Sequence, residues 1–214
     1  MKGIFFPYKD DNVSRSRPVI TYALIGLNII IFIISLFDFE NIITTYGFKP
    51  SEFVLTTLIT SMFLHGGPGH ILGNMWYLFM FGDNVEDKLG KEKYILFYLV
   101  AGIAATLAHY AMNIGSAIPT IGASGAISGV LGAYLVWFPH ARIHYVAYYM
   151  SGRTSAYVIL GFWFLMQFLG ILGSGGGIAF FAHIGGFIFG AAFAWIYKKL
   201  KKDSFNNEHA RTTR

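Results

Sequence analysis

The chain has 214 residues, of which 55% are hydrophobic and only 13% charged, with a mean hydropathy of +0.53 and a net charge of +5. The hydrophobic fraction exceeds that of ordinary soluble proteins, and the charged fraction is lower. The length leaves room for one domain, and the composition indicates that this domain lies in a membrane. The chain contains no cysteine, which excludes disulfides, thiolate catalysis, iron–sulfur clusters and cysteine zinc sites.

Six apolar stretches follow one another along the chain, and a helix needs roughly 17–25 residues to cross a bilayer. The first, from Pro18 to Phe37, contains no charged residue and follows a mostly polar segment, residues 1–17. No small-residue cleavage site follows this stretch, which indicates a retained anchor and not a removed signal peptide. The other five stretches are Pro68 to Phe81 with an extension to Val85, Tyr94 to Met112, Thr120 to Phe138, Ser155 to Leu172, and Ile178 to Tyr197.

The connections between these stretches differ in composition. Residues 38–67 form the longest connection, and their aromatic and apolar side chains predict partial contact with the membrane interface. Residues 173–177 hold four glycines around Ser174, which favours a movable cover. The polar residues 201–214 predict a disordered cytoplasmic tail. Residues 18–200 are therefore expected to form one six-helix domain between a cytoplasmic N-terminal segment and this tail.

The basic residues give an independent test of the number of spans, because short cytoplasmic loops collect lysine and arginine. With six spans and both termini in the cytoplasm, fifteen of the sixteen basic residues lie on the cytoplasmic side and only Lys49 lies outside. Topology and contact with anionic lipid thus explain the positive charge, and no nucleic-acid partner is needed. The cytoplasmic set is Lys2, Lys9, Arg15, Arg17, Lys88, Lys91, Lys93, Arg142, Arg153, Lys198, Lys199, Lys201, Lys202, Arg211 and Arg214.

Polar side chains inside a membrane are costly unless they have partners, so they mark candidate functional positions. Ser124 is predicted a few residues into the fourth helix and His183 about five residues into the sixth. Both then lie roughly 6–8 Å below the outer interface. His70 and Asn74 are four residues apart near the outer end of the second helix and share one face. Three helices thus bring polar groups to one depth.

Small residues at spacings of four on the fourth and sixth helices would let two backbones approach closely in lipid. The Ser124 hydroxyl and the His183 imidazole would then meet at about 2.6–3.2 Å. Histidine is a suitable base for a serine nucleophile, and the absence of Asp and Glu from both stretches indicates a dyad. The backbone N–H of Ser124, with His70 and Asn74, would hold the oxyanion. The small residues are Ser124, Gly125, Ser128, Gly129, Gly132, Gly186 and Gly190.

The segments Gly122-Ala123-Ser124-Gly125 and Ala182-His183-Ile184-Gly185-Gly186, with His65, His70 and Asn74 upstream, resemble the rhomboid intramembrane serine proteases. The resemblance covers nearly the whole chain. It implies an all-α membrane protein with a six-transmembrane-helix bundle and both termini in the cytoplasm. It also implies a serine endopeptidase that needs no cofactor and no metal, and that cleaves transmembrane segments of substrate proteins near the outer face through an acyl-enzyme.

The resemblance implies a role for each matching residue. Ser124 is expected to be the nucleophile, and His183 the general base and later the acid. His70 and Asn74 are expected to stabilise the oxyanion, and His65 to hold the loop before the second helix. Two positions depart from the family pattern: the first outer loop contains neither Trp nor Arg, and Ser128 replaces an aromatic residue that supports the histidine in some members. The expected supporting residues around the site are His65, Gly122, Gly125 and Gly186.

Other functions fit these residues less well. A zinc enzyme is disfavoured because no H-E-x-x-H motif occurs and because His65 and His70 do not share a helix face. A transporter would need charged residues along a path through the bilayer, whereas the polar cluster lies in the outer third. The main alternative is a non-catalytic rhomboid-like protein that binds membrane clients, because a fold does not determine function. The compact plan favours a bacterial cytoplasmic membrane.

Overall fold

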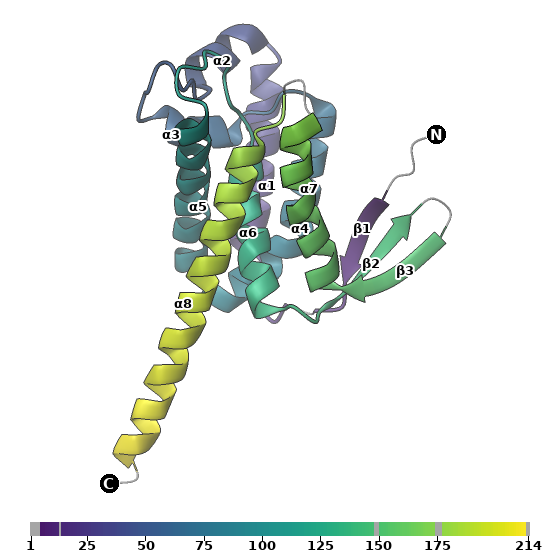
Figure 1. Ribbon diagram of the computed structural model, residues 1–214, viewed down its shortest axis with the longest axis vertical. Helices are drawn as coiled ribbons and strands as arrows, with labels where there is room; N and C mark the ends of the chain where they lie inside the picture. The colour runs from purple at the N-terminus through teal and green to yellow at the C-terminus, as the bar shows by residue number, and fades with distance from the viewer. Residues whose placement is uncertain (1–4, 13, 148–149, 174–176, 213–214) are drawn as a thin grey trace.

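The computed structural model describes residues 5–12, 14–147, 150–173 and 177–212. The helices form a bundle, and three strands form a small sheet at one side of it (Figure 1). In chain order the elements are β1 (Phe5–Asp10), α1 (Val19–Ser35), α2 (Phe39–Tyr46), α3 (Thr57–Thr60), the 3-10 turn η1 (Ser61–Phe63), α4 (Pro68–Leu89), α5 (Lys91–Met112), α6 (Ser124–Trp137), β2 (Arg142–Ala147), β3 (Met150–Ser155), α7 (Ala156–Gly173) and α8 (Phe180–Thr212).

Six helices within the described ranges have 14 or more residues, and each coincides with one of the predicted apolar stretches. They traverse the bundle alternately in opposite directions (Figure 1). Three segments are long and apolar enough to cross a membrane by length and composition: α5, α7 and residues 180–201 of α8. The helices α1 and α6 are apolar but shorter, and α4 carries four charged residues in its last two turns. The chain is therefore a membrane protein.

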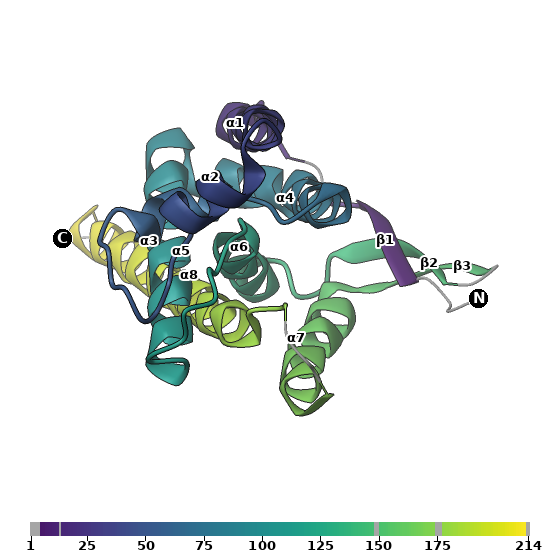
Figure 2. The same ribbon diagram turned by 90° about the horizontal axis from the view of Figure 1, so that it is seen from above.

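Helix α6 lies in the middle of the bundle, with α4, α5, α7 and α8 around it (Figure 2). All ten residues from 125 to 134 are buried, as expected for a helix that is apolar on every side. Small residues make this central position possible, because Gly125, Gly129 and Gly132 present backbone instead of side chains to the neighbouring helices. The first residue of this helix, Ser124, is held at one end of the bundle core.

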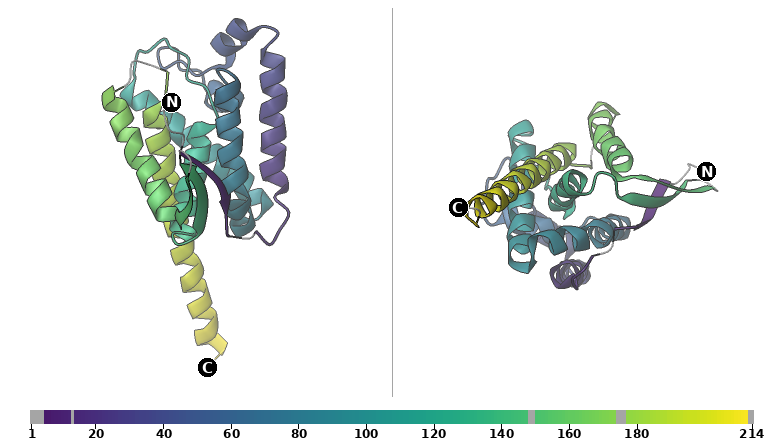
Figure 3. Two further views of the ribbon diagram at one scale, coloured as in Figure 1. Left: turned by 90° about the vertical axis from the view of Figure 1, so that its right-hand side faces the viewer. Right: turned by 90° about the horizontal axis from the view of Figure 1, so that it is seen from below.

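The prediction of an all-α protein is wrong for three segments, which form an antiparallel sheet in the order β1-β2-β3. The sheet contacts α4 through β1, and α7 through β2 and β3 (Figure 3). The first four residues of β2 alternate between polar and apolar, and Ile143 is fully buried, which suits a strand that is covered on one face. Pro7 is tolerated because β1 is an edge strand, and the Pro7 carbonyl accepts a hydrogen bond from Trp76 Nε1 at 2.8 Å.

The sheet is tied to the helices at Asp10, the last residue of β1. Its carboxylate accepts hydrogen bonds from the Tyr134 hydroxyl of α6 at 2.6 Å and from Asn84 Nδ2 of α4 at 3.0 Å. The described part of the N-terminal segment, residues 5–12 and 14–17, is thus joined to the bundle and is not a free polar extension. Strand β1 and the connection after α6 form one sheet.

Helix α6 begins at Ser124, four residues later than the sequence predicted. Residues just before it are held extended by a bridge between Phe48 and Thr120, whose backbones exchange hydrogen bonds of 2.7 and 3.1 Å. Gly122 follows with φ +125°, a conformation that an α-helix does not contain. The connection between α1 and α4, which lacks the Trp-Arg pair, therefore docks on the segment before α6 through its backbone.

Helix α8 continues to Thr212, whereas the sequence predicted a disordered tail from residue 201. A helix that is already nucleated in the bundle extends without a new nucleation cost, which favours helix in a polar continuation as well. The 33 residues of α8 correspond to about 50 Å at 1.5 Å per residue. The helix consequently projects beyond the other helices at the end where the chain terminates (Figure 1).

Candidate active site

The backbones of α6 and α8 come into direct contact at their glycines. A Cβ atom added at Gly186 would meet the Gly125 carbonyl, and one added at Gly190 would meet the backbone of Gly129. A Cβ atom at Gly132 would lie 2.9 Å from the backbone nitrogen of Ala191. We call this contact surface the glycine seam. Contacts this close leave no room for side chains between the two helices, so the seam fixes their separation.

The glycine seam brings Ser124, the first residue of α6, next to His183 in the first turn of α8. Ser124 Oγ and His183 Nε2 lie 2.9 Å apart, within the distance of a hydrogen bond. Both side chains are partly buried. A hydroxyl and an imidazole at this distance have the geometry in which the ring takes the proton of a nucleophilic serine.

Helix α7 supplies two groups that contact His183 and that sequence reasoning did not identify. Gln167 Oε1 lies 2.8 Å from His183 Nδ1, and the indole ring of Trp163 lies 5.9 Å from the imidazole at 35°. Trp163 and Gln167 are four residues apart and therefore project from the same side of α7. The position that is aromatic in some rhomboid proteases, Ser128, instead donates a hydrogen bond to the Ser124 carbonyl at 2.6 Å. The imidazole is thus supported from α7 and not from α6.

The N-terminal part of α4 provides two further polar groups beside the serine. Gly66 N–H donates to His70 Nδ1 at 3.2 Å, so the proton of a neutral His70 ring lies on Nε2. Asn74 is buried, and its Nδ2 has no hydrogen-bond partner among the described residues. An unpaired buried donor costs free energy, and it leaves this amide N–H available to a negatively charged group.

Gly122 determines how closely His70 approaches the serine. A Cβ atom at this position would lie 2.8 Å from His70 Nε2 and 3.5 Å from Ser124 Oγ, and φ of +125° is itself unfavourable for other residues. The Gly122 N–H donates to the Ser61 carbonyl at 2.9 Å, which anchors the turn. Because α6 starts at Ser124, the backbone N–H of Ser124 has no acceptor within the helix and is free to bind an anion.

His65 lies in the loop before α4 and is fully buried. Its ring packs edge-on against His70 at 5.1 Å. Burial, with a smaller contribution from His70, lowers the pKa of His65 to about 4, so the ring is neutral at pH 7. This position gives His65 contact with His70 but no contact with the Ser124 and His183 pair.

A cavity of about 560 Å³ opens beside the serine, and its walls come from α4, α6, α7 and α8. Ser124, His183, His70 and Asn74 all line it. Its volume is in the range of sites that bind small molecules or short peptide segments. The apolar part of the wall is formed by Ile121, Ile127, Leu131, Trp163 and Ile178.

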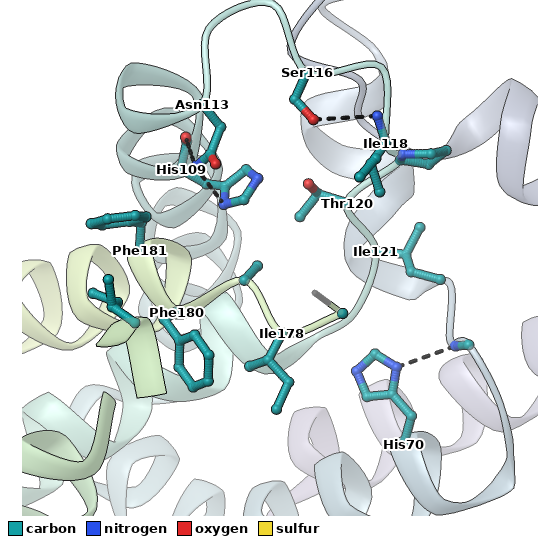
Figure 4. A pocket seen from close by; sticks show the side chains of 15 residues that line it. His70, His109, Asn113, Ser116, Ile118, Thr120, Ile121, Ile178, Phe180 and Phe181 are labelled. Atoms are coloured by element: carbon teal, nitrogen blue, oxygen red, sulfur yellow. Dashed lines mark hydrogen bonds between the residues drawn. The ribbon is translucent and has the colours of Figure 1, made fainter. Parts of the chain in front are cut away.

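A second cavity of about 430 Å³, which we call the outer cavity, adjoins the first at the end of the bundle where α4 and α6 begin, and shares His70, Ile121 and Ile178 with it. His109 and His70 lie on opposite sides of this outer cavity (Figure 4). Polar groups of the outer loops line it as well, including Asn113, which donates to the His109 carbonyl at 2.9 Å. The outer cavity therefore leads from polar groups to His70, which also lines the cavity beside Ser124.

Within the described ranges, no group of three or more His, Asp or Glu side chains is arranged to hold a metal ion. The two histidines nearest the serine, His70 and His183, instead make contacts with the backbone of Gly66 and with the amide of Gln167. These contacts occupy one ring nitrogen of each histidine.

The polar residue that the sequence reasoning missed is Gln167. It is the only amide in the fifth apolar stretch, and only 6% of its surface is exposed. The sequence argument considered Asp and Glu in the fourth and sixth stretches as the third member of a triad, and the fifth stretch contains neither. An uncharged polar side chain inside an apolar helix is itself a signal of function, and that rule would have identified Gln167.

Comparison with known proteins identifies the family of the chain. The family model of the rhomboid domain matches residues 52–200. Rhomboid protein 1, mitochondrial, of Saccharomyces cerevisiae is 29% identical over 215 residues, which cover 93% of this chain and 61% of that protein. Rhomboid protease GluP of Bacillus subtilis is 31% identical over 187 residues, which cover 83% of this chain and 35% of that protein.

A further relative is the presenilin-associated rhomboid-like protein, mitochondrial, of Homo sapiens. It is 28% identical over 188 residues, which cover 84% of this chain and 48% of that protein. The chain thus spans between 35% and 61% of the length of these three curated relatives. The match of the domain over more than half of the sequence shows that the chain belongs to the rhomboid family.

Proposed function

We propose that this chain is an intramembrane serine endopeptidase that cleaves transmembrane segments of other membrane proteins with Ser124 and His183. The observation that carries the proposal is the 2.9 Å contact between Ser124 Oγ and His183 Nε2 at the wall of a cavity of about 560 Å³. Membership of the rhomboid family supports it, because one of the relatives is named a protease.

The chemistry follows from the positions of the polar groups. His183 Nε2 takes the proton of Ser124 while Oγ attacks the carbonyl carbon of the scissile bond. The oxyanion accepts hydrogen bonds from the Ser124 backbone N–H, His70 Nε2–H and Asn74 Nδ2–H. His183 then gives its proton to the leaving amine, and the acyl-enzyme remains. Water that reaches the serine through the outer cavity hydrolyses the acyl-enzyme, with His183 again as the base.

The proposal includes a six-span topology with both termini on the cytoplasmic side. The alternate directions of the six long helices support it. Lys49 lies between α2 and α3, whereas Lys88, Lys91 and Lys93 lie where α4 ends and α5 begins. Ser124 then lies near the outer face, because it starts α6 at the end of the bundle opposite to the turn between α4 and α5. A bacterial cytoplasmic membrane stays a prediction, since the relatives include a Bacillus protein and proteins named mitochondrial.

A client segment is proposed to reach the cavity between α4 and α7. The sheet contacts both helices toward the end of the bundle where α7 begins (Figure 1). Access is therefore proposed at the opposite end, near the outer face. Displacement of α7 or of the loop 173–182 would admit the segment. The centre of that loop, residues 174–176, lies outside the described residues.

The test is covalent labelling of the detergent-solubilised protein with a fluorophosphonate, followed by mass spectrometry. Ser124 Oγ attacks phosphorus and fluoride leaves, which requires an activated serine. We expect an adduct on Ser124 in the wild type, and none on this peptide in Ser124→Ala or His183→Ala. Circular dichroism of each variant checks that the helices are retained.

No adduct on the folded wild type would contradict the proposal and would favour the alternative, a non-catalytic rhomboid-like protein that binds membrane clients. An adduct that persists at Ser124 in His183→Ala would retain a reactive serine but remove His183 as its base. Inhibition by chelators, with unchanged activity in Ser124→Ala, would point to a metal mechanism.

A further inference from the structure

Gln167 stands between α7 and the imidazole of His183, and both ends of its amide are occupied. Nε2 donates to the Trp163 carbonyl one turn earlier at 2.8 Å, and Oε1 lies 2.8 Å from His183 Nδ1. The Trp163 carbonyl can only accept a hydrogen bond, so the amide nitrogen must face it. The amide oxygen therefore faces His183, and the orientation of the amide follows from its partners.

This orientation determines the tautomer of His183. An amide oxygen can only accept, so the hydrogen bond exists when Nδ1 carries the proton of the neutral ring. The other nitrogen, Nε2, then has a free lone pair, and it is the one that faces Ser124 Oγ at 2.9 Å. The opposite tautomer would direct an N–H at the serine and leave two lone pairs facing each other at Gln167. Only the first tautomer accepts the serine proton.

We propose that Gln167 is the positioning residue of the Ser124 and His183 pair, and that it holds His183 in the tautomer and orientation that a general base needs. The inference rests on the proposed function and adds a third member, from α7, to a pair that α6 and α8 bring together. Gln167 acts through His183 and does not contact the reacting atoms. A neutral amide orients the ring but adds no negative charge beside it, in contrast to the carboxylate of a Ser-His-Asp triad.

Two substitutions separate this role from simple packing. Gln167→Met preserves length and volume but removes the acceptor. Gln167→Glu keeps an oxygen that accepts from Nδ1 whether the carboxyl is ionised or protonated. A packing role predicts that Met is tolerated and that Glu, a buried acid, is harmful. A positioning role predicts the reverse order.

The measurement is the rate of fluorophosphonate labelling of Ser124 at saturating probe, with thermal stability in detergent recorded for each protein. We expect Gln167→Met to label at least about tenfold more slowly, the effect of losing one hydrogen bond, and Gln167→Glu to keep most of the wild-type rate. Ile159→Val, a buried change elsewhere on α7, serves as the matched control and should label normally. A Met variant as fast as the wild type, with a slower Glu variant, would overturn the inference.

A second measurement does not depend on reactivity. Nitrogen NMR of the protein with ¹⁵N-labelled histidine, assigned by the signal lost in His183→Ala, reports which ring nitrogen carries the proton. A protonated Nδ1 in the wild type is expected, and a protonated Nε2 would overturn the inference. If the wild type is not labelled at all, the proposed function fails, while the NMR spectra of the wild type and of Gln167→Met still decide whether Gln167 selects the tautomer.

Discussion

The two sides of the site are held in different ways. On one side, α6 and α8 meet at the glycine seam, and ten consecutive residues of α6 are buried. On the other side, only four of the 18 residues of α7 are buried, namely Ala156, Ile159, Leu160 and Gln167. Ser124 and His183, the proposed nucleophile and base, therefore lie on a rigid contact, whereas the groups that contact the His183 ring from α7 come from a helix with little buried surface.

The two modes of support correspond to two geometric quantities, the distance between Ser124 and His183 and the orientation of the His183 ring. The distance between Ser124 and His183 is fixed by backbone atoms, which cannot rearrange without separating two helices. The orientation of the His183 ring depends on the side chains of Trp163 and Gln167, which move with α7. A change in the glycine seam should consequently affect folding and activity together, and a change in α7 should affect activity with little effect on folding.

The largest effect is expected from Gly190→Ala, which breaks the seam. The added methyl group meets the backbone of Gly129, so the helices must separate, and overpacking of this kind costs roughly 1–3 kcal/mol. We expect labelling of Ser124 to be lost and the melting temperature in detergent to fall. Gly161→Ala on α7 is the control, because nothing lies within 4 Å of the added group, and it should melt at or slightly above the wild-type temperature.

The next largest effect concerns Asn74, which α4 places at the cavity. Removal of one oxyanion donor slows acyl transfer by about 10²–10³-fold, so Asn74→Ala should label and turn over more slowly by roughly that factor. The melting temperature should change little, because Asn74 Nδ2 has no partner to lose among the described residues. Leu72→Ala, on the exposed face of α4, should retain the wild-type rate. Equal rates for both variants would remove Asn74 from the mechanism.

A smaller effect is expected from Trp163, one of the two α7 side chains that contact His183. Trp163→Ala removes the ring that contacts the imidazole, and we expect labelling to slow by about fivefold, which corresponds to about 1 kcal/mol of aromatic contact. Trp163→Phe should recover most of the rate. Phe162→Ala, whose side chain is 59% exposed on the neighbouring position, should label like the wild type. A similar loss in Phe162→Ala would indicate a general disturbance of α7.

The smallest effect concerns the sheet that contacts both α4 and α7. Burial raises the pKa of Asp10 from 3.8 to about 6, against the lowering effect of the Tyr134 hydroxyl. Between about pH 4 and 6 the folded protein holds a proton that the unfolded chain releases, so the stability of the docked sheet falls as pH rises through this range. We expect slower hydrogen exchange in β1 at pH 5 than at pH 7, after correction for intrinsic rates. Asp10→Asn should remove most of this pH dependence.

Much of the helical architecture was predictable, because apolar stretches long enough to cross a bilayer are local patterns. The glycine spacing around His183 also predicted close approach of two helices, and the structure places Gly186 and Gly190 against α6. The sheet was not predictable in the same way, because β1 pairs with β2 across most of the chain. Short strands in polar connections carry no signal that specifies such a distant partner.

The candidate site shows the same division. Ser124, His183, His70 and Asn74 could be selected because each is a polar residue at a definable depth in an apolar helix. The support of His183 could not be derived from α6, where Ser128 replaces an aromatic residue, because the rotation of α7 about its axis decides which of its side chains reach the imidazole. That rotation depends on packing and is not visible in a uniformly apolar stretch.

The position of Gln167 and Trp163 on α7 has a consequence for timing. If α7 moves outward to admit a client, it takes the acceptor and the indole ring away from His183. The state in which α7 admits a client and the state in which His183 is oriented for reaction then cannot exist at the same time. A bound segment is cut only if it stays in the cavity until the helix returns, so the enzyme would select its clients by dwell time as well as by affinity.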